Sequence, residues 1–131
     1  MYSLDSDVII DSFNNDVKII ERIKETELQG AQFFVTPIVL AELYEGAYKS
    51  KDKKKNLELI EEFLLAVEII DFSINASRIF GRCKDILKTS GKPTQDFDLL
   101  IASITLDKGL ILVTRNRKHF ENIPDLKIEV W

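Results

Sequence analysis

The chain has 131 residues, of which 45% are hydrophobic and 31% are charged, a composition typical of one soluble globular domain spanning residues 1–131. It carries 22 acidic and 18 basic residues, and this balance argues against a generic nucleic-acid coat, whose surface is usually basic. A nuclease is not excluded, because bound metal ions can offset phosphate charge locally. The sequence has no apolar run long enough to cross a membrane, no signal-peptide pattern and a single cysteine, so we expect a cytoplasmic protein without membrane contact.

Short apolar runs alternate with helical periods along the chain. Five of these runs predict strands, at residues 2–4, 32–35, 67–70, 110–114 and 127–130. Apolar residues at helical spacing predict the intervening helices, with stripes at residues 8–10, 17–23, 39–47, 57–64, 76–87 and 99–104. Thr94 is a candidate cap for the last of these helices. Because alternating strands and helices require crossover connections, we predict an α/β fold, a three-layer α/β/α sandwich with a mainly parallel sheet.

Two acids directly follow the first predicted strand. Asp5 and Asp7 stand where residues 2–4 end, and ligands in open α/β sheets bind at the carboxyl ends of strands. Asp5 is also a good helix cap, because an Asp after a strand commonly accepts from the first turn of the next helix. One cap needs only one acceptor, so the pair of acids favours a ligand site.

Other oxygen-bearing side chains could converge on Asp5. Glu42 lies at the margin of the apolar stripe at residues 39–47, where a carboxylate needs a cation, a donor or a metal, and a structural salt bridge remains an equal alternative. Asp96 and Asp98 precede the most apolar helix, where the helix dipole also favours acids. Asn116 follows the fourth strand.

Clustered carboxylates repel one another, and a hard divalent cation removes that cost. Oxygen ligands suit Mg²⁺ or Mn²⁺, whereas zinc would require His or Cys, of which the chain has one each. The residues alone therefore predict an acidic magnesium or manganese site.

Four segments carry a family resemblance: YSLDSDVIID at residues 2–11, LAELYEGA at 40–47, GKPTQDFDLLIA at 91–102, and LVTRN at 112–116 followed by His119-Phe120. In this order, and over essentially the whole chain, they resemble the PIN-domain ribonucleases, specifically the VapC toxins of prokaryotic toxin–antitoxin pairs. The resemblance implies a metal-dependent endoribonuclease that hydrolyses RNA phosphodiester bonds. It also implies a homodimer that binds a VapB-like antitoxin.

The resemblance assigns roles to individual positions. Asp5, Glu42 and Asp98 match the metal-binding acids of the family, and Asn116 falls where many members have a fourth catalytic Asp. Asp96 matches a nearby accessory acid.

Three further accessory candidates lie next to these acids. Ser6 keeps the hydroxyl of the commoner Thr, and Asp7 replaces the commoner Asn. Arg115 is the favoured phosphate contact in a basic rim that comprises Lys84, Lys88, Lys92, Arg115, Arg117 and Lys118. Cys83 is predicted to be a core thiol, and His119 to pack near Phe120 without a catalytic role.

Two other functions remain open at this point. A phosphatase of the haloacid dehalogenase type would use Asp5 as nucleophile and Asp7 as general acid, but it leaves Glu42 without a role. A catalytically silent PIN scaffold would instead bind RNA or a partner protein.

Overall fold

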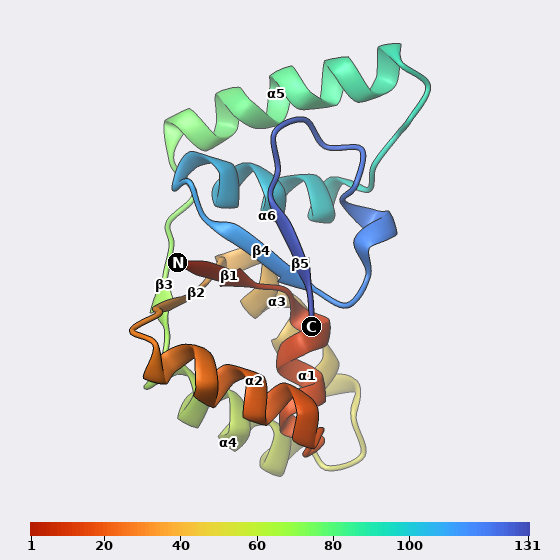
Figure 1. The fold of residues 1–131 in the computed structure, drawn as a ribbon. Helices are drawn as coiled ribbons and strands as arrows, with labels where there is room; N and C mark the ends of the chain where they lie inside the picture. Colours follow the sequence, from red (N-terminus) through yellow and green to blue (C-terminus); the bar gives the residue numbers. More distant parts are fainter.

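The computed structural model describes all residues, 1–131. Its elements, in chain order, are β1 (Tyr2–Leu4), α1 (Ser6–Phe13), α2 (Val17–Leu28), β2 (Phe33–Val35), α3 (Pro37–Lys49), α4 (Lys53–Leu64), β3 (Glu68–Ile69), α5 (Ile74–Thr89), α6 (Asp96–Asp107), β4 (Ile111–Thr114), the 3-10 helix η1 (Arg117–His119) and β5 (Ile128–Val130) (Figure 1). All five predicted strands are confirmed, with small differences at their ends. No helix combines the length and the hydropathy that a membrane span requires.

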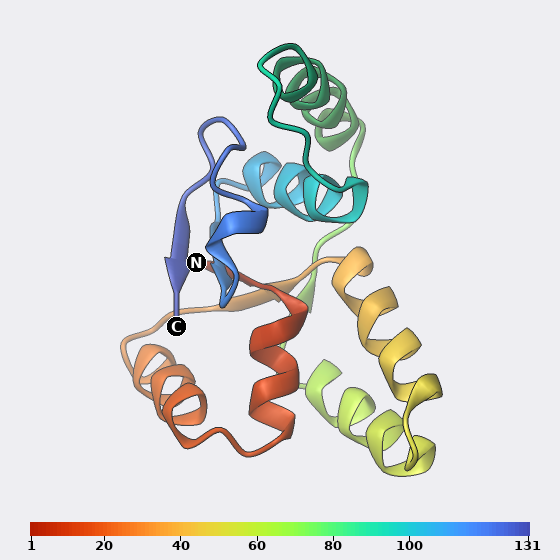
Figure 2. The ribbon, with the colours of Figure 1, turned by 90° about the vertical axis from the view of Figure 1, so that its right-hand side faces the viewer.

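The five strands form one sheet in the order β3-β2-β1-β4-β5, and every neighbouring pair is parallel. Helices α5 and α6 cover one face, α1, α2 and α4 lie on the opposite side, and α3 packs beside α1 and α4 (Figures 1 and 2). The predicted three-layer α/β/α sandwich with a parallel sheet is therefore confirmed.

The strand order reverses direction at the centre of the sheet. The chain moves outward from β1 through β2 to β3, then returns to place β4 on the other side of β1. In open α/β sheets such a switch point leaves a crevice at the carboxyl ends of the two central strands. Here Leu4 ends β1 and Thr114 ends β4, so the residues that follow them face the same crevice.

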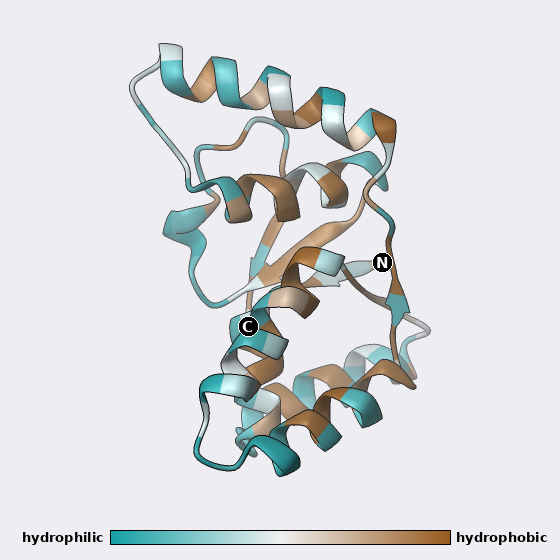
Figure 3. Ribbon diagram, turned by 180° about the vertical axis from the view of Figure 1, so that it is seen from behind, coloured by the Kyte–Doolittle hydropathy of each residue, from teal (hydrophilic) through white to brown (hydrophobic).

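Helix α6 is apolar on nearly every side and packs between the sheet and α5. Leu99, Ile101 and Ile104 are almost fully buried, and hydrophobic residues concentrate along α6 and β4 (Figure 3). The two buried hydroxyls of this helix donate to its own carbonyls: Ser103 Oγ to Leu99 at 2.6 Å, and Thr105 Oγ1 to Ile101 at 2.8 Å. A rigid α6 in turn fixes the residues of its first turn.

Most helices begin with a side-chain cap, but α6 does not. The N-caps with a side-chain acceptor are Asp5, Asp16, Thr36, Asp52 and Ser73. At α6 the N-cap is Gln95, whose side chain makes no capping hydrogen bond, so the prediction that Thr94 caps this helix was wrong. Asp96 and Asp98 in the first turn provide negative charge at the helix N-terminus instead.

Truncating the core of α6 should destabilise the domain strongly. Ile101 has no exposed surface, so Ile101→Ala removes buried contacts and leaves a cavity, which should lower the free energy of unfolding by about 2–5 kcal/mol. Ile74→Ala is the matched control, because Ile74 is 75% exposed and its truncation should change stability by less than about 0.5 kcal/mol. Urea unfolding followed by circular dichroism measures both, and equal values would contradict this packing.

Candidate active site

The largest cavity lies at the switch point of the sheet. It has a volume of about 880 Å³ and is lined by 14 residues, of which one is hydrophobic: Asp5, Ser6, Asp7, Glu42, Pro93, Thr94, Gln95, Asp96, Phe97, Asp98, Asn116, Lys118, His119 and Asn122. The N-terminal ends of α1, α3 and α6 and the short helix η1 lie together around this end of the sheet (Figure 2). Seven of the eight predicted site residues line this cavity, and Arg115 does not.

Asp5 is the most buried acid of the cavity, with 7% of its surface exposed. Its Oδ2 accepts a hydrogen bond from the Thr114 hydroxyl at 2.8 Å, and its Oδ1 accepts from the Ser6 amide at 2.9 Å, which caps α1. Burial, followed by the charge of Asp7, raises the pKa of Asp5 to about 6. Asp5 therefore both caps α1 and lines the cavity.

Glu42 projects from α3 with an oxygen that has no partner. Its Oε1 atom is buried and makes no hydrogen bond, and none of the ion pairs of the structure includes this residue. Burial, followed by the charges of Asp5 and Asp98, raises the pKa of Glu42 to about 7. The salt-bridge alternative for Glu42 is therefore wrong, and its buried oxygen is free to accept a ligand.

Asp98 enters the cavity from the first turn of α6, beside the only histidine of the chain. His119 Nδ1 lies 3.6 Å from Asp98 Oδ2, and His119 Nε2 lies 3.0 Å from Asn116 Nδ2. In a neutral ring that accepts from the Asn116 amide, the proton sits on Nδ1 and faces Asp98. Burial raises the pKa of Asp98, and His119 opposes that shift. His119 thus touches two predicted site residues.

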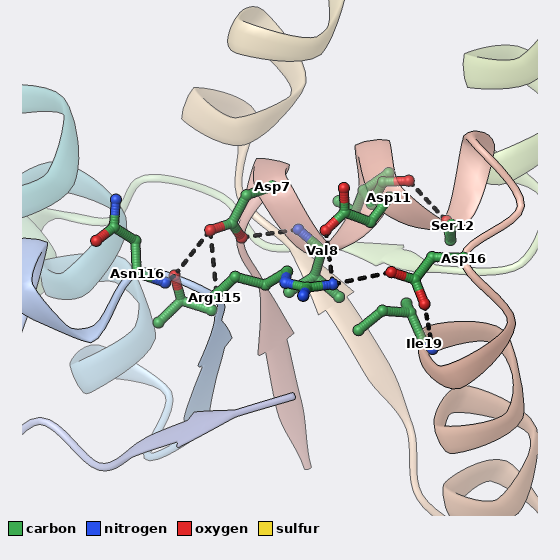
Figure 4. A network of polar contacts seen from close by, with 10 residues as sticks. Asp7, Val8, Asp11, Ser12, Asp16, Ile19, Arg115 and Asn116 are labelled. Atoms are coloured by element: carbon green, nitrogen blue, oxygen red, sulfur yellow. Dashed lines mark hydrogen bonds and ion pairs between the residues drawn. The ribbon is translucent and has the colours of Figure 1, made fainter.

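Asp7 ties the loop after β4 to the start of α1. Its Oδ2 accepts from the Arg115 amide at 3.1 Å and lies 3.3 Å from the Thr114 hydroxyl, while its Oδ1 accepts from the Val8 amide at 2.7 Å (Figure 4). Burial raises the pKa of Asp7, and the Arg115 amide opposes that shift most. These contacts join the loop after β4 to the first turn of α1.

Arg115 points away from the cavity. Its Nη1 atom lies 2.9 Å from Asp11 Oδ2 and 3.0 Å from Asp16 Oδ2, and its side chain extends from the Asn116 side of the loop toward these acids (Figure 4). The predicted phosphate contact by Arg115 is therefore not supported, because both acids already occupy its guanidinium.

Among the other predicted rim residues, only Lys118 lines the cavity. Lys84 Nζ lies 2.7 Å from Asp96 Oδ1, an ion pair between α5 and α6, and Arg117 Nη2 donates to the Ile128 carbonyl at 3.2 Å. The cationic part of the cavity is consequently Lys118, with His119 beside it.

Sequence reasoning missed two residues of the site. Thr114 was taken only as the end of a strand, yet its buried hydroxyl lies within reach of both Asp5 and Asp7. His119 was assigned to packing, and its ring does lie next to Phe120, with 6.4 Å between centroids, but it also lines the cavity. A polar residue at the end of a central strand was the available signal for Thr114. Cys83 is buried in the core, as predicted.

Asp5, Glu42 and Asp98 are the groups that could hold a metal ion. No three His, Cys, Asp or Glu side chains are drawn together as a direct ligand cluster in this conformation. The donor set still fits Mg²⁺, which retains several waters and commonly takes only one or two protein carboxylates. The unpartnered Glu42 oxygen and the raised pKa values of Asp5 and Glu42 show that a cation bound here would relieve both burial and repulsion of these carboxylates.

The model of the PIN domain family matches residues 2–126 of this sequence, and the chain belongs to that family. It is 34% identical over 131 residues to ribonuclease VapC2 of Rickettsia felis, covering 100% of this chain and 98% of the relative. It is 32% identical to a protein of Salmonella typhimurium named tRNA(fMet)-specific endonuclease VapC, covering 99% and 97% of the two chains. The resemblance found in the four sequence motifs is confirmed.

Solved structures show the same relationship. The VapBC2 complex of Rickettsia felis bound to a promoter DNA fragment contains a chain that matches with a TM-score of 0.92 at 33% identity, covering 99% of this chain and 98% of that chain. A chain of VapBC-1 from nontypeable Haemophilus influenzae matches with a TM-score of 0.88 at 30% identity, covering 99% and 97% of the two chains.

Neutralising Glu42 should stabilise the metal-free protein at alkaline pH. Because the folded pKa of about 7 exceeds the ordinary value of 4.5, ionisation of Glu42 opposes folding increasingly as the pH rises between these values. Glu42→Gln removes this penalty, so in a chelator it should raise the free energy of unfolding by on the order of 1 kcal/mol near pH 8, allowing for solvent screening. Near pH 4, where the acid is protonated in both states, the gain should vanish.

Glu45→Gln is the matched control on the same helix. Glu45 is exposed and pairs with Lys49, so its neutralisation removes an attraction and should not stabilise the protein at alkaline pH. Denaturant titrations at both pH values measure the effect. A Glu42→Gln protein less stable than the parent at alkaline pH would contradict the unrelieved charge at this site.

Proposed function

We propose that this chain is a divalent-metal-dependent endoribonuclease that uses Mg²⁺ or Mn²⁺, and that it is the toxin of a VapBC-type pair. The observation that carries the proposal is the buried, unpartnered Glu42 oxygen in a cavity shared with Asp5 and Asp98. Oxygen-rich acid sites of this kind suit hard divalent ions. The relatives described above are named ribonuclease or endonuclease, and the match covers nearly their full length. This supports RNA as the substrate.

The chain's own residues would hold the reactants in place. Asp5, fixed by Thr114 and by the Ser6 amide, provides an oriented carboxylate at the floor of the cavity. Glu42 and Asp98 complete the ligand set from α3 and α6. A bound divalent ion would lower the pKa of a coordinated water and stabilise negative charge on the phosphate.

One cationic and one neutral donor line the same cavity as these acids. Lys118 and the Asn116 amide line the same cavity and are suited to hold phosphate oxygens of the RNA backbone. His119 positions Asp98 and Asn116 relative to each other through its two ring nitrogens. An amide at Asn116 adds no negative charge, so the site carries less repulsion toward phosphate than one with a fourth acid there.

A phosphatase that uses Asp5 as nucleophile is less compatible with the residues of the cavity, because Glu42 would lie in such a site without a role. The hydrolytic mechanism uses both residues.

The proposed partner is a VapB-like antitoxin, because the matched structures are VapBC complexes. We also propose that the chain forms a homodimer and acts in the cytoplasm, where its RNA substrate and antitoxin would be present. Copurification of the chain with the product of an adjacent small gene tests the pairing.

Replacing Asp5 should abolish RNA cleavage without unfolding the protein. Asp5→Asn keeps the size of the side chain but removes a charge from the proposed metal site, so the cleavage rate with Mg²⁺ should fall by at least about 100-fold. Asp85→Asn, a change at an exposed acid on α5 outside the cavity, should leave the rate unchanged. The assay follows total RNA and mapped cut ends by sequencing, with circular dichroism to verify folding.

Chelation should stop cleavage by the parent protein, and added Mg²⁺ or Mn²⁺ should restore it. Unchanged cleavage by a folded Asp5→Asn protein would remove Asp5 from the mechanism. A trapped phosphoaspartate at Asp5 would favour the phosphatase instead, and a parent protein that binds RNA but never cleaves it would favour a silent scaffold.

A further inference from the structure

Phe97 is the one hydrophobic side chain that lines the acidic cavity, and about half of its surface is exposed. It is 52% exposed and is a member of neither of the two buried core clusters. It also lies between Asp96 and Asp98 in the first turn of α6. An aromatic ring is thus held at the wall of a cavity that is otherwise polar.

The ring belongs to a rigid element. Phe97 stands at helical spacing from Ile101 and Ile104, both of which have no exposed surface, so the apolar stripe of α6 continues past the core into the cavity. The buried part of the helix fixes the backbone of residue 97, and the ring cannot retreat into the core without displacing that stripe. The ring therefore presents an apolar face to a ligand that enters the cavity.

We propose that Phe97 is a stacking platform for an unpaired base next to the scissile phosphate of the RNA, and the inference rests on the proposed ribonuclease function. Phe97 adjoins Asp98 in the chain and lines the same cavity as Asp5, so a phosphate held at these acids would place a neighbouring base near the ring. Proteins that recognise single-stranded RNA commonly stack splayed bases on aromatic side chains.

The polar surroundings fit a nucleotide better than an apolar partner. Lys118 lines the cavity and can hold a backbone phosphate, while thirteen of the 14 lining residues, all except Phe97, are not hydrophobic. A base presents an aromatic face with polar edges, which matches one ring in a polar wall. In a duplex that face is covered by neighbouring bases, so the proposal commits the substrate to an unpaired segment.

The test measures binding with metal withheld, so that it does not depend on cleavage. The probe is a 12-nucleotide unpaired RNA with 2-aminopurine at successive positions, compared with the same strand annealed to its complement. The proteins are the parent, Phe97→Ala, Phe97→Leu and Phe97→Trp. Phe97→Leu is the matched control, because it keeps an apolar side chain of similar size but removes the aromatic face.

The parent and Phe97→Trp should bind the unpaired RNA and quench 2-aminopurine at one position. Phe97→Ala and Phe97→Leu should bind it about tenfold more weakly and lose that quenching, since base–aromatic stacking is worth this order of affinity. With Mg²⁺ present, the loss should appear in KM for the same RNA, while Mg²⁺ affinity stays unchanged. If the parent protein binds and quenches the RNA but does not cleave it, the proposed ribonuclease function is wrong and the stacking role of Phe97 still holds.

Equal binding by the parent and Phe97→Ala overturns the proposal, as does full affinity in Phe97→Leu. Sedimentation of the same proteins tests whether a second copy of the chain, instead of RNA, covers Phe97. If Phe97→Ala converts a dimer of the parent into a monomer, the ring belongs to a contact between copies and the stacking role is overturned.

Discussion

The repulsion among carboxylates that share one cavity is the constraint on which the site depends. Asp5, Glu42 and Asp98 lie in the same crevice, and burial raises the pKa of each above its ordinary value, with the charges of neighbouring carboxylates adding to the shift. The fold does not relieve this repulsion with a basic side chain at Glu42, whose buried oxygen lacks any partner. This repulsion lowers the stability of the folded state. A cation that binds the folded state but not the unfolded chain would restore that stability.

The fold creates this constraint through its topology. β1 and β4 are neighbours although they are far apart in sequence, and their carboxyl ends place Asp5 beside Thr114. The Thr114 hydroxyl and the Asp7 carboxylate then join the loop after β4 to the start of α1. The polar contacts that assemble the site are thus the same contacts that close the end of the sheet.

Local sequence patterns were sufficient for the strands, the layers and the acids at the strand ends. The pattern of alternating strands and helices implied a parallel sheet, and the carboxyl ends of parallel strands necessarily lie at one edge. The direction of individual side chains was not predictable in the same way. Arg115 pairs with Asp16, about 100 positions earlier in the chain, and only the folded arrangement reveals that this acid, and not a phosphate, occupies its guanidinium. His119 was missed because a lone His next to a buried Phe has an ordinary packing role.

The most direct test of the acidic metal site is the number of protons released when Mg²⁺ binds, measured by calorimetry in buffers of different ionisation enthalpy. The pKa values of about 6 for Asp5 and about 7 for Glu42 predict release of roughly one to one and a half protons per ion near pH 6 and almost none near pH 8. The affinity should rise over the same range. Binding near pH 6 without proton release, or an affinity independent of pH, would contradict a site built from these two acids.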